Sequence, residues 1–494
     1  MKTLQYDVVA IGSGFGSAPV ALRLAEAGFS VLVIEKGPAI NPEKDFKQSQ
    51  NINYLQKYYK QHDGKGFGVT AVEALGGGSG FYLGISLRAP SFIFDSKDYK
   101  NNTYWPSNIS RPTLDPYYKK AEDMLSVNQI DTKDVSKNGQ LFSQMMSNLN
   151  LSSDRTRLAV TDCKKCGFCV TGCTYNAKQS LLLNYIPKAR AKGVTYITEA
   201  EALSIKPLQK NGKYKYELTA RIKNTDHLSI QARVVTLGAG AVGTAKFLLK
   251  NKDNLPNLSS TLGKTLTGNV FYTAFGALPK SMRDGEMFKG NGLPGTMSYE
   301  FLESHKMLLI PYKTLPIQMM ARVRITLTDG QGKKSWWGQS HANMMKSFKK
   351  RMFILTATSF LQDYAQMNID SHEKLRITYS PSEQTVQRHK KNNALLKSLL
   401  AKNGLKIAES DVINWEGKLF ENLHYNSTHP VGSARMAIDE ANGVIDENNE
   451  VFNYKGLFVT DASAIPSPLI VPPTLTILAM AERATESIMN RLQH

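Results

Sequence analysis

The stretch that decides the fold is Tyr6-Asp7-Val8-Val9-Ala10-Ile11-Gly12-Ser13-Gly14-Phe15-Gly16-Ser17. Its first half is a short apolar run rich in β-formers, which predicts a buried strand. Its second half is dense in glycine and predicts a tight turn. From Ala18 to Ala27 apolar residues recur at helical spacing, so the turn opens a helix whose free amides point at the glycine loop.

The residues after this helix complete a dinucleotide-binding pattern. Gly28 ends the helix, and residues 31–34 predict a second buried strand that finishes in Glu35. The helix amides suit a pyrophosphate, and the carboxylate can bind both ribose hydroxyls. Ser17 occupies the third glycine position of GxGxxG, with Gly16 one residue earlier. The complete strand, loop, helix, strand and acid still predicts a dinucleotide site; the alternative is a glycine turn in another α/β domain.

Composition sets the size and the surface of the molecule. A chain of 494 residues with 41% apolar content can bury a large core, and we expect two interleaved domains. The formal net charge of +19 would suit nucleic acid, anionic lipid or an acidic electron-transfer protein. The lysines are dispersed, so we favour a general solubility bias and expect no nucleic-acid partner. The basic and aromatic stretch 333–351 could rest on an anionic membrane surface or cap a lipid-binding cleft.

The sequence also bears on location. The first strand begins by Tyr6, which leaves no room for a removable signal, and no run of about 18 apolar residues appears. We expect a cytoplasmic protein that is peripheral to a membrane at most.

All four cysteines lie in one short segment, at Cys163, Cys166, Cys169 and Cys173. This C-x2-C-x2-C-x3-C spacing is that of bacterial ferredoxins, and it is not the distribution of a disulfide framework. The spacing favours one iron-sulfur cluster, either 4Fe-4S on all four thiolates or 3Fe-4S on three. The alternatives are a structural zinc site and reduced thiols that only pack.

Further motifs follow in a fixed order along the chain. A second glycine loop, Leu75-Gly76-Gly77-Gly78-Ser79-Gly80, precedes Leu87-Arg88-Ala89-Pro90. Near the C-terminus come Thr428-His429-Pro430-Val431-Gly432-Ser433-Ala434-Arg435-Met436 and Val459-Thr460-Asp461-Ala462. An apolar helix is expected from Thr474 to Arg491.

Together these segments resemble the glucose-methanol-choline (GMC) oxidoreductase family, especially its cholesterol-oxidase-like branch. The resemblance implies an α/β fold, with a Rossmann-like FAD-binding domain and an inserted α+β substrate domain built on a β-sheet. It divides the chain into FAD-binding parts at 1–90, 180–270 and 426–494, a cap and connection at 91–160, the four-cysteine loop at 161–179, and the substrate domain at 271–425.

The resemblance also assigns roles at the cofactor. It implies that Gly12, Gly14 and Gly16 bind the FAD pyrophosphate and that Glu35 binds the adenosine ribose. Glu35 disfavours the 2′-phosphate of NADP, and the later motifs favour FAD over NAD. The remaining cofactor contacts it implies are Gly77, Gly78 and Ser79 beside the isoalloxazine, and Asp461 and Ala462 at the ribityl or pyrophosphate portion. In the covalently flavinylated members of the family that this chain resembles, a histidine follows this glycine loop. No histidine follows it closely here, so the resemblance implies noncovalent FAD.

His429 matches the active-site histidine of the family, and its implied role is the base that takes the hydroxyl proton of an alcohol. A second family position, usually Asn or His, falls on Pro472, which has no side-chain donor. His424, Asn426 and Thr474 are candidates to replace it.

The expected function is therefore oxidation of the CH-OH group of a small-molecule alcohol, sterol-like or otherwise lipophilic, by hydride transfer to flavin. Electrons would pass to oxygen, a quinone or an acceptor protein, with a cluster as relay if one is present. Two other functions stay open: a flavin-dependent lyase or decarboxylase without alcohol oxidation, and a basic flavoprotein that binds lipid surfaces.

Overall fold

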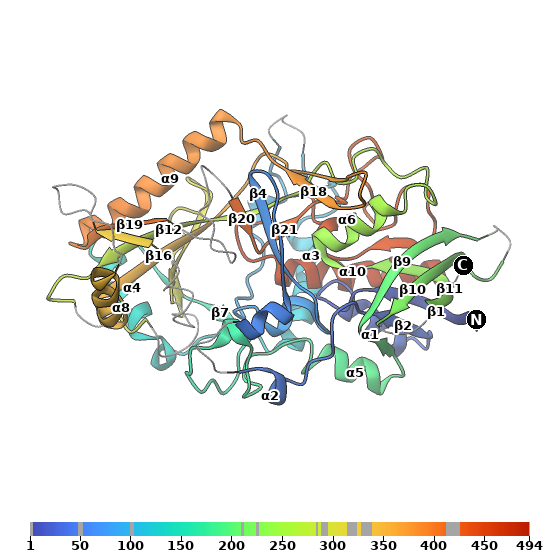
Figure 1. Ribbon diagram of the computed structural model, residues 1–494, viewed down its shortest axis with the longest axis horizontal. Coiled ribbons are helices and arrows are strands. Elements are labelled where there is room, and N and C mark those ends of the chain that lie inside the picture. The colour runs from blue at the N-terminus through green and yellow to red at the C-terminus, as the bar shows by residue number, and fades with distance from the viewer. Residues whose placement is uncertain are drawn as a thin grey trace.

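The computed structural model describes residues 3–47, 53–98, 103–208, 212–223, 227–282, 285–287, 295–313, 324–327, 338–411 and 425–493. The chain forms an elongated molecule with a sheet in each half (Figure 1). Both termini lie in the half that holds β1 and β11. The other half contains the strands of the central part of the sequence, as the inserted substrate domain of the expected fold class requires.

The first sheet is the nucleotide-binding sheet, and its centre is parallel. Strand β1 pairs in parallel with β2 on one side and with β11 on the other. In spatial order the strands are β8 (Thr195–Ile197), β2 (Val31–Ile34), β1 (Thr3–Ile11), β11 (His227–Leu237), β10 (Tyr216–Ile222) and β9 (Ala200–Pro207), with β22 (Leu457–Val459) also on β11. The predicted first strand and second strand are confirmed as β1 and β2.

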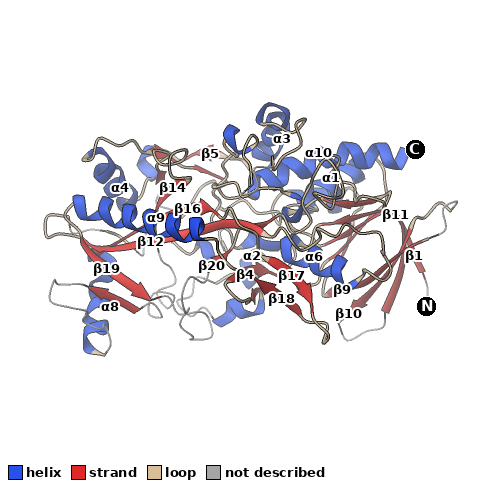
Figure 2. Ribbon diagram, turned by 90° about the horizontal axis from the view of Figure 1, so that it is seen from above, coloured by secondary structure: helices blue, strands red, loops and turns tan. Residues whose placement is uncertain are grey.

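Helices cover this sheet because their apolar sides have no other core to join. Helix α1 (Ala18–Glu26) starts directly after the first glycine loop, as predicted, and packs between α5 (Tyr185–Ala191) and α10 (Thr474–Gln493). Helix α10 also packs on α3 (Arg111–Met124), and these helices lie together on one side of the sheet (Figure 2). Helix α6 (Gly240–Lys250) follows β11.

The second sheet belongs to the insert and is antiparallel where its long strands meet. The register of β12 against β16 runs from Asn269 opposite Phe360 to Ala277 opposite Met352. The sheet contains β14 (Met307–Tyr312), β16 (Met352–Phe360), β12 (Thr267–Ala277), β19 (Lys406–Asp411) and β15 (Arg324–Leu327), with β21 (Pro430–Val431) on β12. Helix α9 (Glu383–Lys402) packs across β12.

A small third sheet connects the two halves. It contains β20 (Tyr425–Ser427), β4 (Phe67–Val72) and β3 (Tyr59–His62). Strand β20 lies beside β12, and β21 pairs with the start of β12. Residues 425–431 are therefore held between the two main sheets. The smaller elements are α2 (Pro42–Asp45), α4 (Lys137–Ser147), α8 (Gln339–Arg351), β5 (Asn128–Gln129), β6 (Asp154–Arg155), β7 (Arg157–Leu158), β13 (Thr296–Met297), β17 (Gln366–Ile369) and β18 (Leu375–Thr378).

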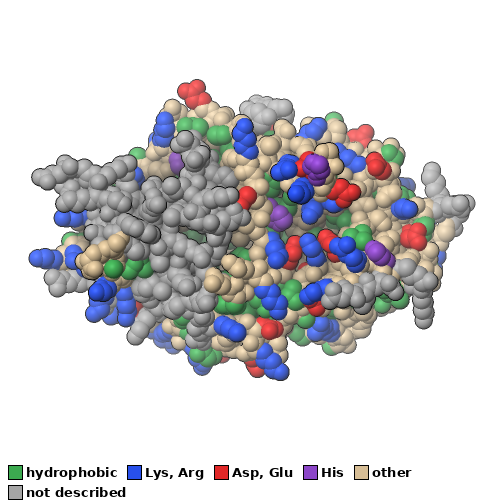
Figure 3. Space-filling model, in the orientation of Figure 1, with side chains coloured by type: hydrophobic (Ala, Val, Ile, Leu, Met, Phe, Trp, Pro, Cys, Tyr) green, Lys and Arg blue, Asp and Glu red, His purple; other side chains and the backbone are tan. Residues whose placement is uncertain are grey.

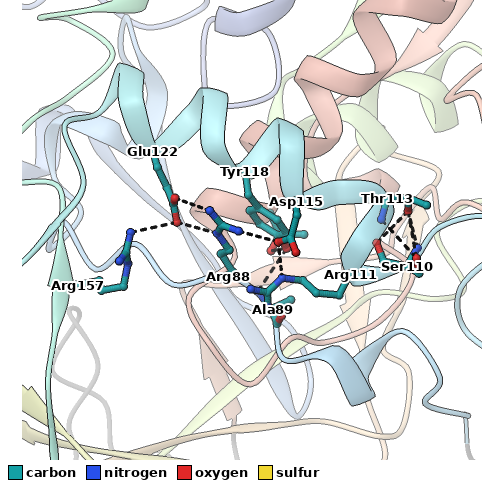
Figure 4. A network of polar contacts seen from close by, with 10 residues as sticks. Arg88, Ala89, Ser110, Arg111, Thr113, Asp115, Tyr118, Glu122 and Arg157 are labelled. Atoms are coloured by element: carbon teal, nitrogen blue, oxygen red, sulfur yellow. Dashed lines mark hydrogen bonds and ion pairs between the residues drawn. The ribbon is translucent and has the colours of Figure 1, made fainter.

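A network of charged side chains fixes the segment after the second glycine loop to α3 (Figure 4). Arg88 donates to both carboxylate oxygens of Glu122, at 2.8 and 2.6 Å, and to Asp115 at 2.7 Å. Arg111 donates to Asp115 and to the carbonyl of Ala89. Glu122 is buried, and its charge is tolerated because it is paired with Arg88.

The described surface shows how the positive and negative side chains are distributed. On the face shown in Figure 3, Lys and Arg side chains alternate with Asp and Glu over the described residues. Residues 333–337 of the basic stretch lie outside the described part of the chain, while α8 holds the rest. Among the helices that the structure describes, no segment has the length and apolar character needed to span a bilayer.

Candidate functional site

A large cavity lies between the two sheets. Its volume is about 1450 Å³, more than the roughly 300–1,000 Å³ of a typical small-molecule site, so it has room for a cofactor and a substrate together. Residues from the first glycine loop, the second glycine loop, the His429 segment and the substrate sheet all line it. The cavity is therefore the place where the motifs of the sequence meet.

The three glycines of the first loop have different reasons to be glycine. A Cβ on Gly12 would lie 2.5 Å from the Gly238 oxygen, and one on Gly16 would lie 2.5 Å from Cα of Asp461. Those two residues are small because protein packs against them. A Cβ on Gly14 would meet nothing nearer than 3.9 Å, which is an ordinary contact distance, so the protein has room for it. Packing against protein therefore does not explain the glycine at position 14, whereas a ligand in the cavity would.

Glu35 ends β2 at the cavity wall. Its Oε2 accepts hydrogen bonds from the Ser13 amide at 3.0 Å and from the Ser13 hydroxyl at 2.7 Å, and Oε1 accepts from the Gly37 amide at 2.7 Å. Burial raises the pKa of Glu35 to about 7, although these hydrogen bonds oppose the shift. The carboxylate therefore both ties the glycine loop to β2 and lines the cavity.

The end of the cavity near Glu35 is polar. Lys36 forms ion pairs with Glu73 at 3.0 Å and Glu201 at 3.5 Å, and Arg221 pairs with Glu201 at 3.0 Å. All four of these side chains line the cavity. This end suits a nucleoside, in contrast to the apolar wall that the substrate sheet contributes at the other end.

The second glycine loop contributes only part of what the sequence predicted. Gly77 and Gly78 line the cavity, and a Cβ on Gly78 would meet no atom within 4 Å. Ser79 is fully buried, and it is not among the lining residues. Its Oγ donates to the Gly76 carbonyl at 2.7 Å and accepts from the Leu181 amide at 3.2 Å. Ser79 thus stabilises the loop from behind.

Asp461 and Ala462 both line the cavity, but the Asp461 side chain is fully engaged with protein. Its Oδ2 accepts from the Gly240 amide at 2.7 Å and from the Thr244 hydroxyl at 2.5 Å. Its Oδ1 accepts from the amide and the hydroxyl of Ser463. The carboxylate thereby ties the short helix η6 (Ala462–Ala464) to the start of α6. Any contact of Asp461 with a ligand falls to its backbone.

His429 lies between β20 and β21 and lines the cavity half-buried. Its amide donates to the Ser427 hydroxyl at 3.0 Å, which fixes the turn, and its ring lies 5.2 Å from the ring of Phe271. Burial lowers the pKa of His429 to about 4. The ring is therefore neutral at ordinary pH.

Asn269 on β12 decides the proton position on this ring. Its Nδ2 lies 3.3 Å from Nδ1 of His429. The amide cannot be turned over, because Oδ1 accepts from the Ile470 amide at 3.0 Å and Nδ2 donates to the Val471 carbonyl at 2.8 Å. An amide nitrogen only donates, so Nδ1 accepts and the neutral ring carries its proton on Nε2. Nε2 has no hydrogen-bond partner among the described residues.

The peptide that Asn269 holds is strained. Ile470 has φ of 64°, a left-handed conformation that is rare for a β-branched residue. Its carbonyl accepts from the Thr358 hydroxyl at 2.6 Å, while its amide donates to Asn269. Such strain persists only where surrounding contacts enforce it, and it is common at functional sites. The left-handed conformation of Ile470 sets the direction in which the chain continues through Pro472 and Pro473 into α10.

The candidates for the second catalytic position are now placed. Pro472 lines the cavity and offers no donor there. Asn426 lines it too, but its amide donates to Thr70 and accepts from Gln61. Thr474 begins α10 at the cavity, and its hydroxyl has no partner within the described ranges. His424 lies outside the described residues. Of the two described candidates, Asn426 and Thr474, Thr474 keeps more hydrogen-bonding capacity for a ligand.

The four cysteines are half-buried free thiols. All four are described, and within the described chain no three His, Cys, Asp or Glu side chains gather as metal ligands. The predicted iron-sulfur cluster, and the zinc alternative, are therefore not supported. The loop instead forms part of the cavity wall through Val170. Its carbonyls accept hydrogen bonds from protein donors, and those contacts are Tyr54 to Thr171 at 2.6 Å, Tyr59 to Val170 at 3.1 Å and Lys178 to Cys169 at 2.6 Å.

Comparison with known proteins identifies the family. Models described as GMC oxidoreductase match residues 11–264 and residues 364–481. The first match alone covers more than half of the 494 residues, and the chain belongs to the GMC oxidoreductase family. FAD is the cofactor expected for this family.

Individual relatives are more distant. A cholesterol oxidase of Acinetobacter baumannii is 26% identical, with 99% of this chain and 95% of the relative covered. A long-chain-alcohol oxidase, FAO4B of Arabidopsis thaliana, is 23% identical, with coverage of 99% and 68%. The solved pyridoxine 4-oxidase from Mesorbium loti, at 15% identity, has a TM-score of 0.69 over 98% of this chain and 99% of its own. That likeness bears on the fold, and it agrees with the predicted fold class.

The residues present fit FAD. Gly14 and Gly78 leave open backbone at two points of the cavity wall, where a Cβ would fill the space. Helix α1 begins directly after the first glycine loop, and its amino end supplies amides and a favourable dipole for phosphates.

Sequence reasoning missed Asn269, Thr358 and Ile470. They lie in segments without a recognised motif, and they reach the site only because β12 and β16 pass beside residues 470 and 471. The signal that could have found Asn269 is weak: it is an amide side chain, preceded by a glycine, in a strand whose other polar residues are threonines.

Proposed function

We propose that this chain oxidises the CH-OH group of a lipophilic alcohol, by transfer of a hydride from the carbinol carbon to FAD. The observation that carries the proposal is the position of His429, on the cavity wall between the glycine loops and an apolar sheet face. When bound, FAD would supply the hydride acceptor.

The chain's own residues would hold the cofactor and the alcohol. Gly14, Gly77 and Gly78 would admit the cofactor closely, Glu35 would bind the ribose, and the backbone at Asp461 and Ala462 would contact its central part. On the substrate side, Phe271, Phe275, Ile310 and Ile354 line the cavity and would exclude water from an apolar substrate.

His429 would contact the hydroxyl group through Nε2. In the tautomer that Asn269 favours, Nε2–H would donate to the substrate oxygen and orient it. As the hydride passes from the carbinol carbon to FAD, the hydroxyl proton would pass to solvent water in the cavity, which leaves the carbonyl product. The base role expected from the sequence needs the other tautomer, with the proton on Nδ1. In that tautomer Nδ1–H would face the donor Nδ2 of Asn269, and turning the amide over to accept from Nδ1–H would break its hydrogen bonds to residues 470 and 471. The geometry therefore favours His429 as the group that binds and orients the hydroxyl.

The test is turnover of the holoenzyme with sterols, long-chain alcohols and sugars, followed both by oxygen uptake and by dye reduction. Lipophilic alcohols should be oxidised, and His429→Ala should lower kcat by about 100-fold or more, the usual effect of losing such a group. His372→Ala is the matched control, because His372 is exposed in the turn between β17 and β18. Oxidation of sugars alone, or an unaffected His429→Ala enzyme, would contradict the proposal.

A second candidate is a flavin-dependent lyase or decarboxylase, and Pro472 is the observation that favours it. Proline removes the hydrogen-bonding side chain of the family's second position, and Asn269 opposes a basic Nε2 on His429. Chemistry that needs no removal of a hydroxyl proton would be compatible with both features. Conversion of a carboxylic acid without net oxidation, unchanged in His429→Ala, would favour this candidate.

A further inference from the structure

The substrate sheet presents a regular pattern to the cavity. Alternate residues of three adjacent strands line it, as the two-residue period of a β-strand requires. The lining residues are Phe271, Thr273 and Phe275 on β12, Ile354, Thr356 and Thr358 on β16, and Ile310 and Tyr312 on β14. These strands lie side by side in one half of the molecule (Figure 2).

The pairing register sorts these residues into rows across the sheet. Phe271 lies opposite Thr358, Thr273 opposite Thr356, and Phe275 opposite Ile354. The first row is next to His429, because the Phe271 ring contacts the imidazole. The hydroxyl of Thr358 in that row is already used, as it donates to the Ile470 carbonyl. The third row contains Phe275 and Ile354, and it continues on β14 with Tyr312.

The middle row is different, because its two hydroxyls are hardly used. Oγ1 of Thr273 and Oγ1 of Thr356 lie 3.4 Å apart, a weak contact. Within the described residues neither hydroxyl has another hydrogen-bond partner. Together they retain at least one donor and several lone pairs. Thr273 is exposed to the cavity, whereas Thr356 is largely buried behind it.

The distance from His429 follows from strand geometry. Two residues along a strand span about 6.8 Å, so the threonine row lies roughly 7 Å beyond the Phe271 row. A substrate whose hydroxyl is at His429 and whose body follows the sheet would pass over both threonines. The two threonine hydroxyls are the uncommitted polar groups in the row next to the Phe271 row, and the Tyr312 hydroxyl on β14 lies one row further along.

We propose that Thr273 and Thr356 form a second polar subsite, which recognises a hydroxyl or carbonyl oxygen about 7 Å from the carbon that is oxidised. The inference rests on the proposed function and narrows it. The substrate class is then an amphipathic alcohol with a second oxygen on an otherwise apolar frame, not a simple alkanol. Remote hydrogen bonds of this kind act on binding and so on KM.

The experiment compares matched substrates. Holoenzyme is assayed with 1-octanol and with the octanediols that carry a second hydroxyl at successive carbons, and the ratio of kcat/KM for diol over monool is measured. Wild type should prefer one diol. Thr273→Val and Thr356→Val, which keep the side-chain shape, should each lower that preference by about 3- to 10-fold, mainly through KM. Thr273→Ser and Thr356→Ser keep the hydroxyl and should retain it.

The outcomes separate the inference from the proposed function. Absence of flavin reduction by every alcohol overturns both. Turnover of the alcohols with no preferred diol, or valine variants that leave the ratio unchanged, overturns the subsite alone. Titration of the holoenzyme with the diols in the His429→Ala background gives a second readout, since binding perturbs the flavin spectrum without turnover. The preferred diol should bind more weakly once Thr356 is valine.

Discussion

The side-chain amide of Asn269 lies 3.3 Å from Nδ1 of His429, and two backbone groups fix which way that amide faces. A residue of the inserted sheet thus sets the tautomer of a residue near the C-terminus. The proton of the neutral ring is on Nε2, on the side away from Asn269. In the function that we propose, His429 therefore meets the substrate as a hydrogen-bond donor.

Asn269→Asp should reverse this preference. A carboxylate accepts from Nδ1–H, so the variant should shift the ring to the Nδ1–H tautomer and raise the pKa of His429. Nitrogen-15 NMR of histidine-labelled protein distinguishes the two tautomers, and His429→Gln assigns the signal. The variant should also lose stability, because aspartate cannot donate to the Val471 carbonyl. A wild-type ring that carries its proton on Nδ1 would refute the tautomer assignment.

The pH profile of kcat/KM should lack the fall near pH 6.5 that an ordinary histidine would produce. Because burial lowers the pKa of His429 from 6.5 to about 4, the ring stays neutral as the pH falls through 6.5. kcat/KM should therefore remain level there and fall only toward pH 4. The lowered pKa also links His429 to the free energy of unfolding. Its contribution is fully present above pH 6.5 and is lost as the pH falls toward 4, because the unfolded chain takes up the proton first. His429→Gln should therefore make the free energy of unfolding less dependent on pH in this range. A fall in kcat/KM near pH 6.5 that disappears in His429→Gln would contradict the lowered pKa of His429.

Gly14 and Gly16 should respond oppositely to alanine. Gly14→Ala places a methyl group where the protein has room for it, so the apo-protein should keep its stability but bind FAD roughly 10-fold more weakly or worse, as overpacking costs about 1–3 kcal/mol. Gly16→Ala pushes against Asp461 and should destabilise the apo-protein by about 1–3 kcal/mol. Thermal denaturation of apo-protein and FAD titration separate the two. Equal loss of stability in both variants would argue against a cofactor cradle at Gly14.

Lys178 should matter for structure and not for metal. Its Nζ donates to the carbonyls of Gly80, Tyr82 and Cys169, and so joins the second glycine loop to the cysteine turn. Lys178→Met should lower the free energy of unfolding by roughly 2–3 kcal/mol, because buried carbonyls lose a charged donor. The exposed Lys192→Met is the control. Iron and sulfide analysis of protein purified without air should give no stoichiometric iron, and a full cluster would overturn our account of the loop.

Much of the nucleotide-binding half could be predicted from local pattern. The first strand, the glycine turn, α1, β2 and α10 each appear where periodicity and glycine placement put them, because each depends on neighbours within one segment. The position of the Ser79 side chain differs from the expected one, because it is buried and does not line the cavity. The loop lies near the cavity, as predicted. In its tight 3-10 turn, however, the next residue after Gly78 points in another direction, so the Ser79 hydroxyl faces the protein interior.

The parts that could not be predicted depend on contacts between distant segments. The thiolate spacing of the cysteines is compatible with a cluster, yet Tyr54, Tyr59 and Lys178 bind the carbonyls of that loop and shape it as a wall. Asn269 is about 160 residues from His429 in sequence. Strand pairing between β12 and β21 brings them together, and nothing in either local sequence encodes that pairing alone.

The most direct test of the central claim is a single turnover without oxygen. The holoenzyme is mixed anaerobically with a lipophilic alcohol, and with the same alcohol deuterated at the carbinol carbon, while flavin absorbance is recorded. We predict bleaching of the flavin, slowed by the deuterium and strongly slowed in His429→Ala. Flavin that stays oxidised with every alcohol tried, or bleaching indifferent to both the isotope and His429, would contradict hydride transfer at this site.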